Sequence, residues 1–134
     1  MKLDLHTGHT SLLDVVFIAL LGAVIAIHTA GLTDQVSSSL YLGVGYVLLI
    51  VTSFVSMILV GQRDQRGWLL AGLIGLVNAV GFVLSRTTGL PHAHGDIGNW
   101  SETLGQWSLA ADVALIVLAI VALWRHRRDK RLNP

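Results

Sequence analysis

The residue types best suited to bind a metal gather in one short segment of the chain. His92 and His94 are separated by a single residue, and Asp96 and Glu102 follow them closely in the sequence. In an extended segment, residues at i and i+2 point to the same side, so the two imidazoles could chelate one ion. Imidazole with carboxylate suits zinc, copper(II) or iron. The segment therefore predicts a metal site; the structural alternative is a solvated loop in which Asn99 and Glu102 cap the next helix.

A second set of polar residues lies inside strongly apolar segments: His28, Asn78, Arg86 and Asp112. Polar groups inside a membrane cost free energy unless they have partners, which makes each one a functional candidate. The simplest prediction is a structural ion pair between Arg86 and Asp112, with His28 hydrogen-bonded nearby. The alternative is that His28 and Asp112 join the loop residues as metal ligands. Asn78 is expected to bond to a neighbouring helix.

Haem binding is a further alternative, since His28 could be one axial ligand and His92 or His94 the other. The pair of His6 and His9 near the amino terminus could also bind a metal. No ladder of titratable residues continues through the other half of the apolar segments, which argues against a proton path.

Composition excludes several classes of protein. The 134 residues are 53% hydrophobic and only 13% charged, whereas soluble domains carry about 25% charged residues. The net charge of +1 argues against a nucleic-acid partner. The chain has no cysteine, which excludes disulfides, iron–sulfur clusters and thiol chemistry. No catalytic motif or phosphate-binding loop is present.

The apolar residues form four segments, each near the roughly 20 residues that a transmembrane helix needs. The segments are 12–32, 40–61, 67–85 and 106–124, with a loop at 86–105 and a basic tail at 125–134. The prediction is an all-α fold, a four-transmembrane-helix bundle that forms a single integral membrane domain. Asp14 is expected to cap the first helix. Thr52 and Ser56, and the small residues Ala71, Gly75 and Ala79, are expected to pack between helices.

Lysine and arginine predict the orientation of the bundle, because cytoplasmic segments are enriched in them. One side has eight: Lys2, Arg63, Arg66, Arg125, Arg127, Arg128, Lys130 and Arg131. The other side has Arg86 alone. We therefore expect a multi-pass protein of the cytoplasmic (inner) membrane with both termini cytoplasmic and the loop facing out.

Three short motifs resemble a group of small actinobacterial four-helix membrane proteins of unassigned function. They are Ala26-Ile27-His28, the run Ser85-Arg86-Thr87-Thr88-Gly89-Leu90-Pro91, and the acidic position 112. The resemblance covers nearly the whole chain. It implies the four-helix fold and that His28, Arg86 and Asp112 belong together. This chain departs from the pattern in having Asp rather than Glu at position 112.

Three classes of function fit these observations. The first is a non-enzymatic accessory subunit or binding protein with an outward His/carboxylate site for a metal ion or small ligand. Its partners would be the lipid bilayer and a larger membrane complex. The second is a transporter or channel component, which would need a homo-oligomer because four helices cannot easily enclose a pathway. The third is an enzyme, such as a metal-assisted hydrolase or a metal- or haem-dependent redox subunit.

Overall fold

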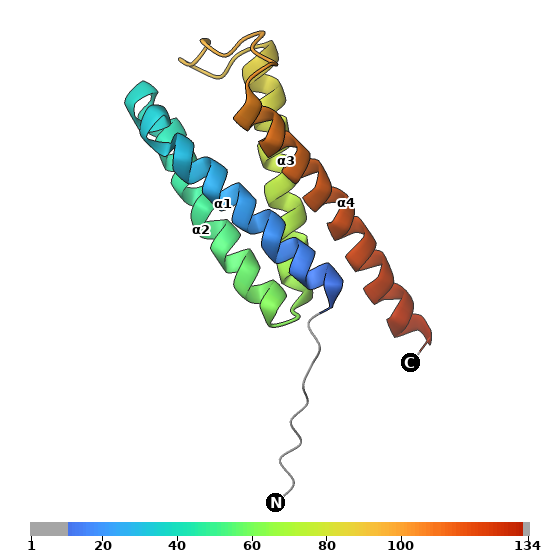
Figure 1. The fold of residues 1–134 in the computed structure, drawn as a ribbon. Helices are drawn as coiled ribbons and strands as arrows, with labels where there is room; N and C mark the ends of the chain where they lie inside the picture. The colour runs from blue at the N-terminus through green and yellow to red at the C-terminus, as the bar shows by residue number, and fades with distance from the viewer. Residues whose placement is uncertain (1–10, 133–134) are drawn as a thin grey trace, which may run out of the picture.

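The computed structural model describes residues 11–132 and consists of four helices. They are α1 (Leu12–Ser38), α2 (Leu40–Gly61), α3 (Gln65–Thr87) and α4 (Thr103–Leu132). Consecutive helices run in opposite directions, so α1 begins and α4 ends at the same end of the bundle (Figure 1). We call this the tail end, and we call the opposite end, where residues 88–102 connect α3 to α4, the loop end. The predicted all-α, four-helix architecture is confirmed.

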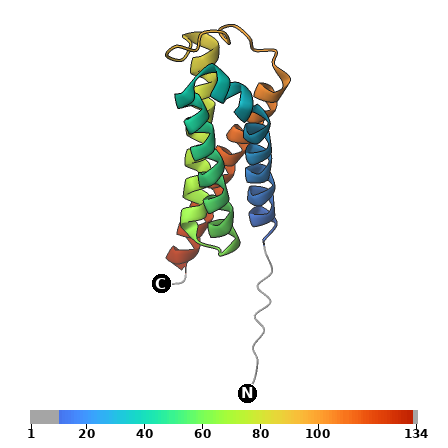
Figure 2. The ribbon, with the colours of Figure 1, turned by 90° about the vertical axis from the view of Figure 1, so that its left-hand side faces the viewer.

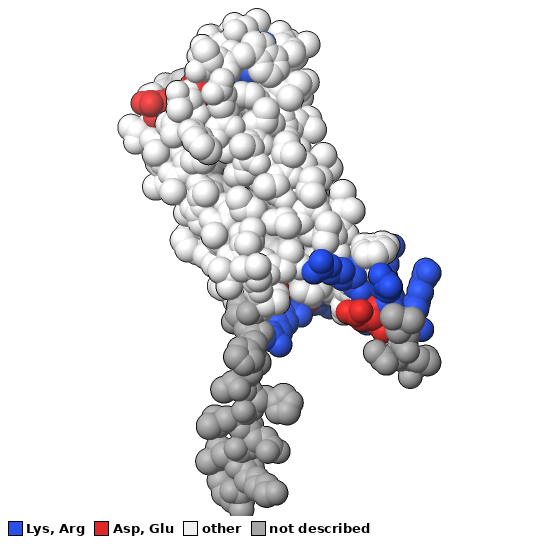
Figure 3. All heavy atoms as spheres, turned by 45° about the vertical axis from the view of Figure 1, so that its right-hand side comes forward, with Lys and Arg blue, Asp and Glu red and all other residues white. Residues whose placement is uncertain are grey.

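Each helix is long and apolar enough to cross a membrane. With 22 to 30 residues per helix, the helices span about 33 to 45 Å at a rise of 1.5 Å per residue. Large apolar side chains are exposed along all four helices. The middle of the face drawn in Figure 3 is uncharged, a few charged atoms lie near the loop end, and Lys and Arg gather at the tail end. Such a surface is typical of a multi-pass membrane protein.

The helices extend beyond the predicted apolar segments. The first continues to Ser38 and is joined to α2 by Ser39 alone. The fourth begins at Thr103 and continues to Leu132, so the basic segment is helical over the part that the structure describes. A helix keeps forming backbone hydrogen bonds in polar sequence until a cap or breaker stops it, and so hydropathy marks only its apolar part.

Between a polar cluster at the tail end and polar residues in the loop-end half, the core is apolar. On α1, the buried stripe consists of Phe17, Leu21 and Val24, with Asp14 at its start and His28 at its end. This spacing of three or four residues places them on one helix face. The stripe packs with apolar residues of the other helices: Val60, Ala71, Ile74, Ala111, Leu115, Ala119 and Ala122. Helix α1 lies beside α2, and α3 lies beside α4 (Figures 1 and 2).

Helices α3 and α4 approach each other closely at a glycine. A Cβ placed on Gly75 would lie 2.5 Å from the carbonyl oxygen of Asp112 and 3.2 Å from Cβ of Leu115. Small residues allow such close approach between membrane helices. Ala71, one turn earlier, is fully buried. The close crossing brings α3 and α4 together at the level of Asp112.

Candidate functional site

Arg86 anchors the loop to the end of the bundle. It lies in the last turn of α3, and its side chain is only 4% exposed. Its Nη1 lies 2.9 Å from Oδ1 of Asp96, its Nη2 pairs with Glu102, and its guanidinium stacks over the ring of Phe82. The side chains of Asp96 and Glu102 are 50% and 45% exposed. One buried cation thus holds two carboxylates that also face the surroundings.

Backbone contacts fix the course of the loop as well. Leu90 and Ala93 exchange two hydrogen bonds across a tight turn, with N···O distances of 3.1 and 2.9 Å. The amide of Gly98 donates to the carbonyl of Arg86, and the hydroxyl of Tyr41 donates to the carbonyl of Pro91 at 2.6 Å. The loop is therefore attached both to the end of α3 and to the start of α2.

The loop histidines lie on the turn rather than on an extended segment. His92 has a φ of 57°, in the left-handed region, and both His92 and His94 are exposed. The ring of His94 packs against Gly89, where a Cβ would lie 2.6 Å from its Cδ2. The backbone is therefore not the extended strand that the predicted chelating pair assumed. In residues 11–132, no group of three or more His, Asp or Glu is placed to hold a metal ion.

A separate polar network lies inside the bundle. His28 on α1 bonds through Nδ1 to the carbonyl of Val24 at 2.8 Å and through Nε2 to Oδ1 of Asn78 on α3 at 3.2 Å. The Nδ2 of Asn78 donates to both carboxylate oxygens of Asp112 on α4, at 2.9 Å each, and to Ser108 at 3.2 Å. His28 is 4% exposed and Asp112 is fully buried. The network joins three helices.

The predicted ion pair between Arg86 and Asp112 is therefore replaced by two separate sites. Arg86 pairs with loop carboxylates, and the partners of Asp112 are Asn78 and Ser108. The two sites differ in depth: Arg86 lies eight residues beyond Asn78 on α3, about 12 Å along the helix axis. Both ring nitrogens of His28 already have partners, so a metal or haem iron would have to displace one of them.

Two residues of this region were missed by the sequence interpretation. The ring of Tyr46 on α2 lies 4.8 Å from the ring of His28, and Tyr46 is within electrostatic range of Arg86, Asp96 and Glu102. It therefore stands between the buried network and the loop site. Ser108 precedes Asp112 by four residues, a spacing that places both on one face of α4. The four-residue spacing could have identified Ser108 as a partner of Asp112. A single tyrosine in an apolar segment, in contrast, gives no sign of its role.

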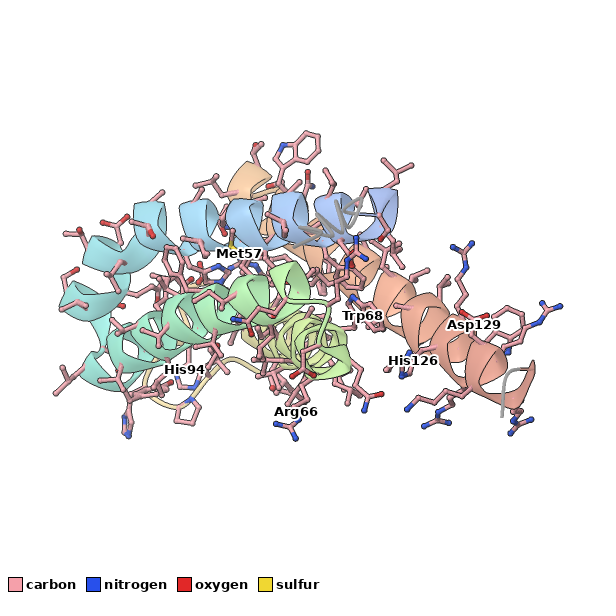
Figure 4. The ribbon with its side chains drawn as sticks, turned by 90° about the horizontal axis from the view of Figure 1, so that it is seen from below. Met57, Arg66, Trp68, His94, His126 and Asp129 are labelled. Atoms are coloured by element: carbon pink, nitrogen blue, oxygen red, sulfur yellow. The ribbon has the colours of Figure 1, made fainter. Side chains whose placement is uncertain are left out.

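The tail end has its own polar cluster. Asp14 forms a capping box with Ser11, in which each side chain bonds to the backbone of the other residue. The indole nitrogen of Trp68 donates to Asp14 at 3.2 Å, and the ring of His126 meets Trp68 edge-on at 5.9 Å between centroids. Figure 4 shows Trp68 and His126 between the helices, whereas Asp129 lies on the projecting end of α4. These contacts fix α1, α3 and α4 to one another.

The remaining candidate residues fall into different environments. Ser56 donates to the carbonyl of Gly67 on α3 at 2.9 Å and so links two helices. Thr52 bonds instead to carbonyls of its own helix, because its hydroxyl can reach the preceding turn. Glu102 precedes the first residue of α4, so it does not form the predicted capping box with Asn99. His6 and His9 lie outside the described residues.

Comparisons with family models, with curated proteins and with solved structures gave no match. The resemblance to small actinobacterial membrane proteins therefore stays a prediction. The function has to be inferred from the two polar sites and from the membrane-spanning fold that positions them.

Proposed function

We propose that the protein is a non-enzymatic accessory subunit or binding protein of the cytoplasmic membrane, with its loop end facing out. Its ligand would be a metal ion or another small cation at the loop site. One observation carries the proposal: Asp96 and Glu102 share the guanidinium of Arg86, yet each side chain remains about half exposed.

The charge distribution supports this orientation. In the described residues, the tail end carries Arg63, Arg66 and the basic last turns of α4. The loop end carries Arg86, which is already paired with two carboxylates. Lys and Arg flanking membrane helices favour the cytoplasmic side. The tail end would therefore be cytoplasmic.

The chemistry of the loop site supports cation binding. One guanidinium opposite two carboxylates leaves a formal charge of −1. Arg86 contacts Oδ1 of Asp96 and Oε2 of Glu102, which leaves Oδ2 and Oε1 available to a ligand. His92 and His94 lie on the same loop and are exposed. The described residues do not form a complete set of metal ligands, so water or a partner protein would complete it.

The experiment uses the tag-free protein in lipid nanodiscs. Metal content is measured by mass spectrometry, and Zn²⁺ or Cu²⁺ is then titrated into metal-free protein by calorimetry. We expect binding that is weakened at least tenfold in Asp96→Asn/Glu102→Gln and in His92→Ala/His94→Ala. Asp34→Asn, an exposed carboxylate on α1, is the matched control. Equal binding by all variants, or no binding by the native chain, would overturn the proposal.

A second candidate is a transporter or channel component that acts as a homo-oligomer. The buried network of His28, Asn78 and Asp112 favours it, because ionisable groups inside a membrane often mark ion or proton pathways. Native mass spectrometry from nanodiscs would report the oligomer. An absorption spectrum of the same sample tests the redox alternative, since bound haem would give a Soret band. If the protein is a monomer and shows no Soret band, the transporter and redox alternatives are excluded and the binding role remains.

A further inference from the structure

We propose that His28, Asn78 and Asp112 form a buried proton-exchange site. In this site one proton moves between the imidazole of His28 and the carboxyl group of Asp112, and the side-chain amide of Asn78 rotates by 180°. The proposal concerns the interior of the bundle and is independent of cation binding at the loop.

The hydrogen bonds define the first state of the site. A backbone carbonyl can only accept, so Nδ1 of His28, which bonds to the carbonyl of Val24, must carry a proton. Nε2 faces Oδ1 of Asn78, which also only accepts, and so Nε2 carries a proton as well. An imidazole with both nitrogens protonated is a cation. The first state is therefore a His28 imidazolium.

In this first state, the orientation of the Asn78 amide follows from its contacts with an ionised Asp112. The oxygen and nitrogen of an amide are assigned from their partners, and Nδ2 lies 2.9 Å from both oxygens of the carboxylate. An ionised carboxylate only accepts, and the amide nitrogen only donates. Asp112 is thus the anion that balances the His28 cation, with one neutral amide between them.

A second state uses the same three side chains and the same number of protons. The Nε2–H bond of His28 breaks and one O–H bond forms on Asp112, while Asn78 keeps both amide protons. The amide then turns by 180°, so that Nδ2 donates to Nε2 of His28 and the new hydroxyl donates to Oδ1 of Asn78. Every link between the three residues is kept, and the site changes from a separated ion pair to two neutral groups.

The surroundings act on the free energy of the charged state in two opposite ways. His28 is flanked by Tyr46 of α2, and Asp112 accepts further bonds only from Ser108. These neighbours are neutral, and the charged residues near Tyr46 belong to the loop site: Arg86, Asp96 and Glu102. Burial without a direct ion pair penalises the charged state, whereas the aligned amide dipole stabilises it. The two effects oppose each other.

The experiment measures both ends of the site in the same sample. Protein with ¹⁵N-labelled histidine and ¹³C-labelled aspartate is reconstituted in lipid bilayers. Solid-state NMR then reports how many ring nitrogens of His28 are protonated and whether Asp112 is ionised. His28→Gln and Asp112→Asn assign the two signals. Across a temperature series, the fraction of imidazolium should equal the fraction of carboxylate. Neutral His28 together with ionised Asp112 would overturn the proposal.

Variants test the role of the amide. Asp112→Asn removes the counter-charge, and the imidazolium signals of His28 should be lost. Asn78→Leu removes the bridge, and the two fractions should no longer match. Ser53→Ala, another buried polar residue, is the control and should leave both signals unchanged. If Asn78→Leu does not fold, Ser108→Ala serves instead: it removes a donor to the carboxylate and should lower both charged fractions equally. Unequal changes in that variant would refute the coupling.

Discussion

Alanine at Gly75 tests the close crossing of α3 and α4 that positions the buried network. The added Cβ would lie 2.5 Å from the backbone oxygen of Asp112, and ordinary contacts begin at 3.4 Å. The obstacle is backbone, which cannot rotate away, so α4 must retreat by about 1 Å. Overpacking of this kind costs about 1 to 3 kcal/mol. The same movement would stretch the bonds between Asn78 and Asp112.

Gly81 provides the matched control, because it lies on the same helix and a Cβ there meets nothing within 4 Å. Replacing glycine by alanine favours a helix by about 1 kcal/mol at either position. The difference between Gly75→Ala and Gly81→Ala therefore isolates the clash, and we expect Gly75→Ala to be less stable by about 1 to 3 kcal/mol.

The assay is reversible unfolding in mixed micelles with a rising fraction of sodium dodecyl sulfate, followed by far-ultraviolet circular dichroism. The free energy of unfolding is compared for the native chain and the two variants. If both variants gain the same stability, α3 and α4 are not in close contact at Gly75, and the geometry of the buried network would have to be revised.

Predictions at Asp14, Ser56 and Ser53 use the same unfolding assay, and one at Tyr41 uses hydrogen exchange. Asp14→Ala should lose about 1 to 2 kcal/mol, because it removes the capping-box bond to the Ser11 backbone and the acceptor of the Trp68 indole. Asp34→Ala at an exposed position should change stability by less than about 0.5 kcal/mol. Ser56→Ala should cost about 1 kcal/mol for a lost interhelical hydrogen bond, whereas Ser53→Ala should be neutral or stabilising, since its hydroxyl is buried without a partner. Tyr41→Phe should speed hydrogen exchange in the loop, measured by mass spectrometry, without changing global stability; slow exchange in that variant would mean that the bond to Pro91 does not hold the loop.

Hydropathy was enough to predict the four helices, because the membrane requires long apolar segments and leaves few alternatives. Two local roles could also be inferred. Asp14 sits three residues after a serine, which is the spacing of a capping box. Asn78 lies in the middle of an apolar helix, where an amide needs a partner on a neighbouring helix.

The partners of Arg86 could not be predicted in the same way. The predicted pair of Arg86 and Asp112 assumed a fourth segment that begins at position 106. Helix α4 begins at Thr103, and three more residues move Asp112 about 4.5 Å further from the loop end. The carboxylates that bind Arg86 lie on a loop whose course depends on three left-handed residues, Gly89, His92 and Gly98. Hydropathy carries no information on such a turn.

The single residue between α1 and α2 has a consequence for how the chain enters the membrane. Ser39 ends one helix and begins the next, and a Cβ on Gly43 would lie 2.5 Å from the side chain of Val36. So short a connection does not allow α1 and α2 to move apart. The two helices are expected to be inserted together, as a preformed hairpin. Later, any sliding of α1 along the membrane normal must carry α2 with it, so the first half of the protein moves as one rigid body.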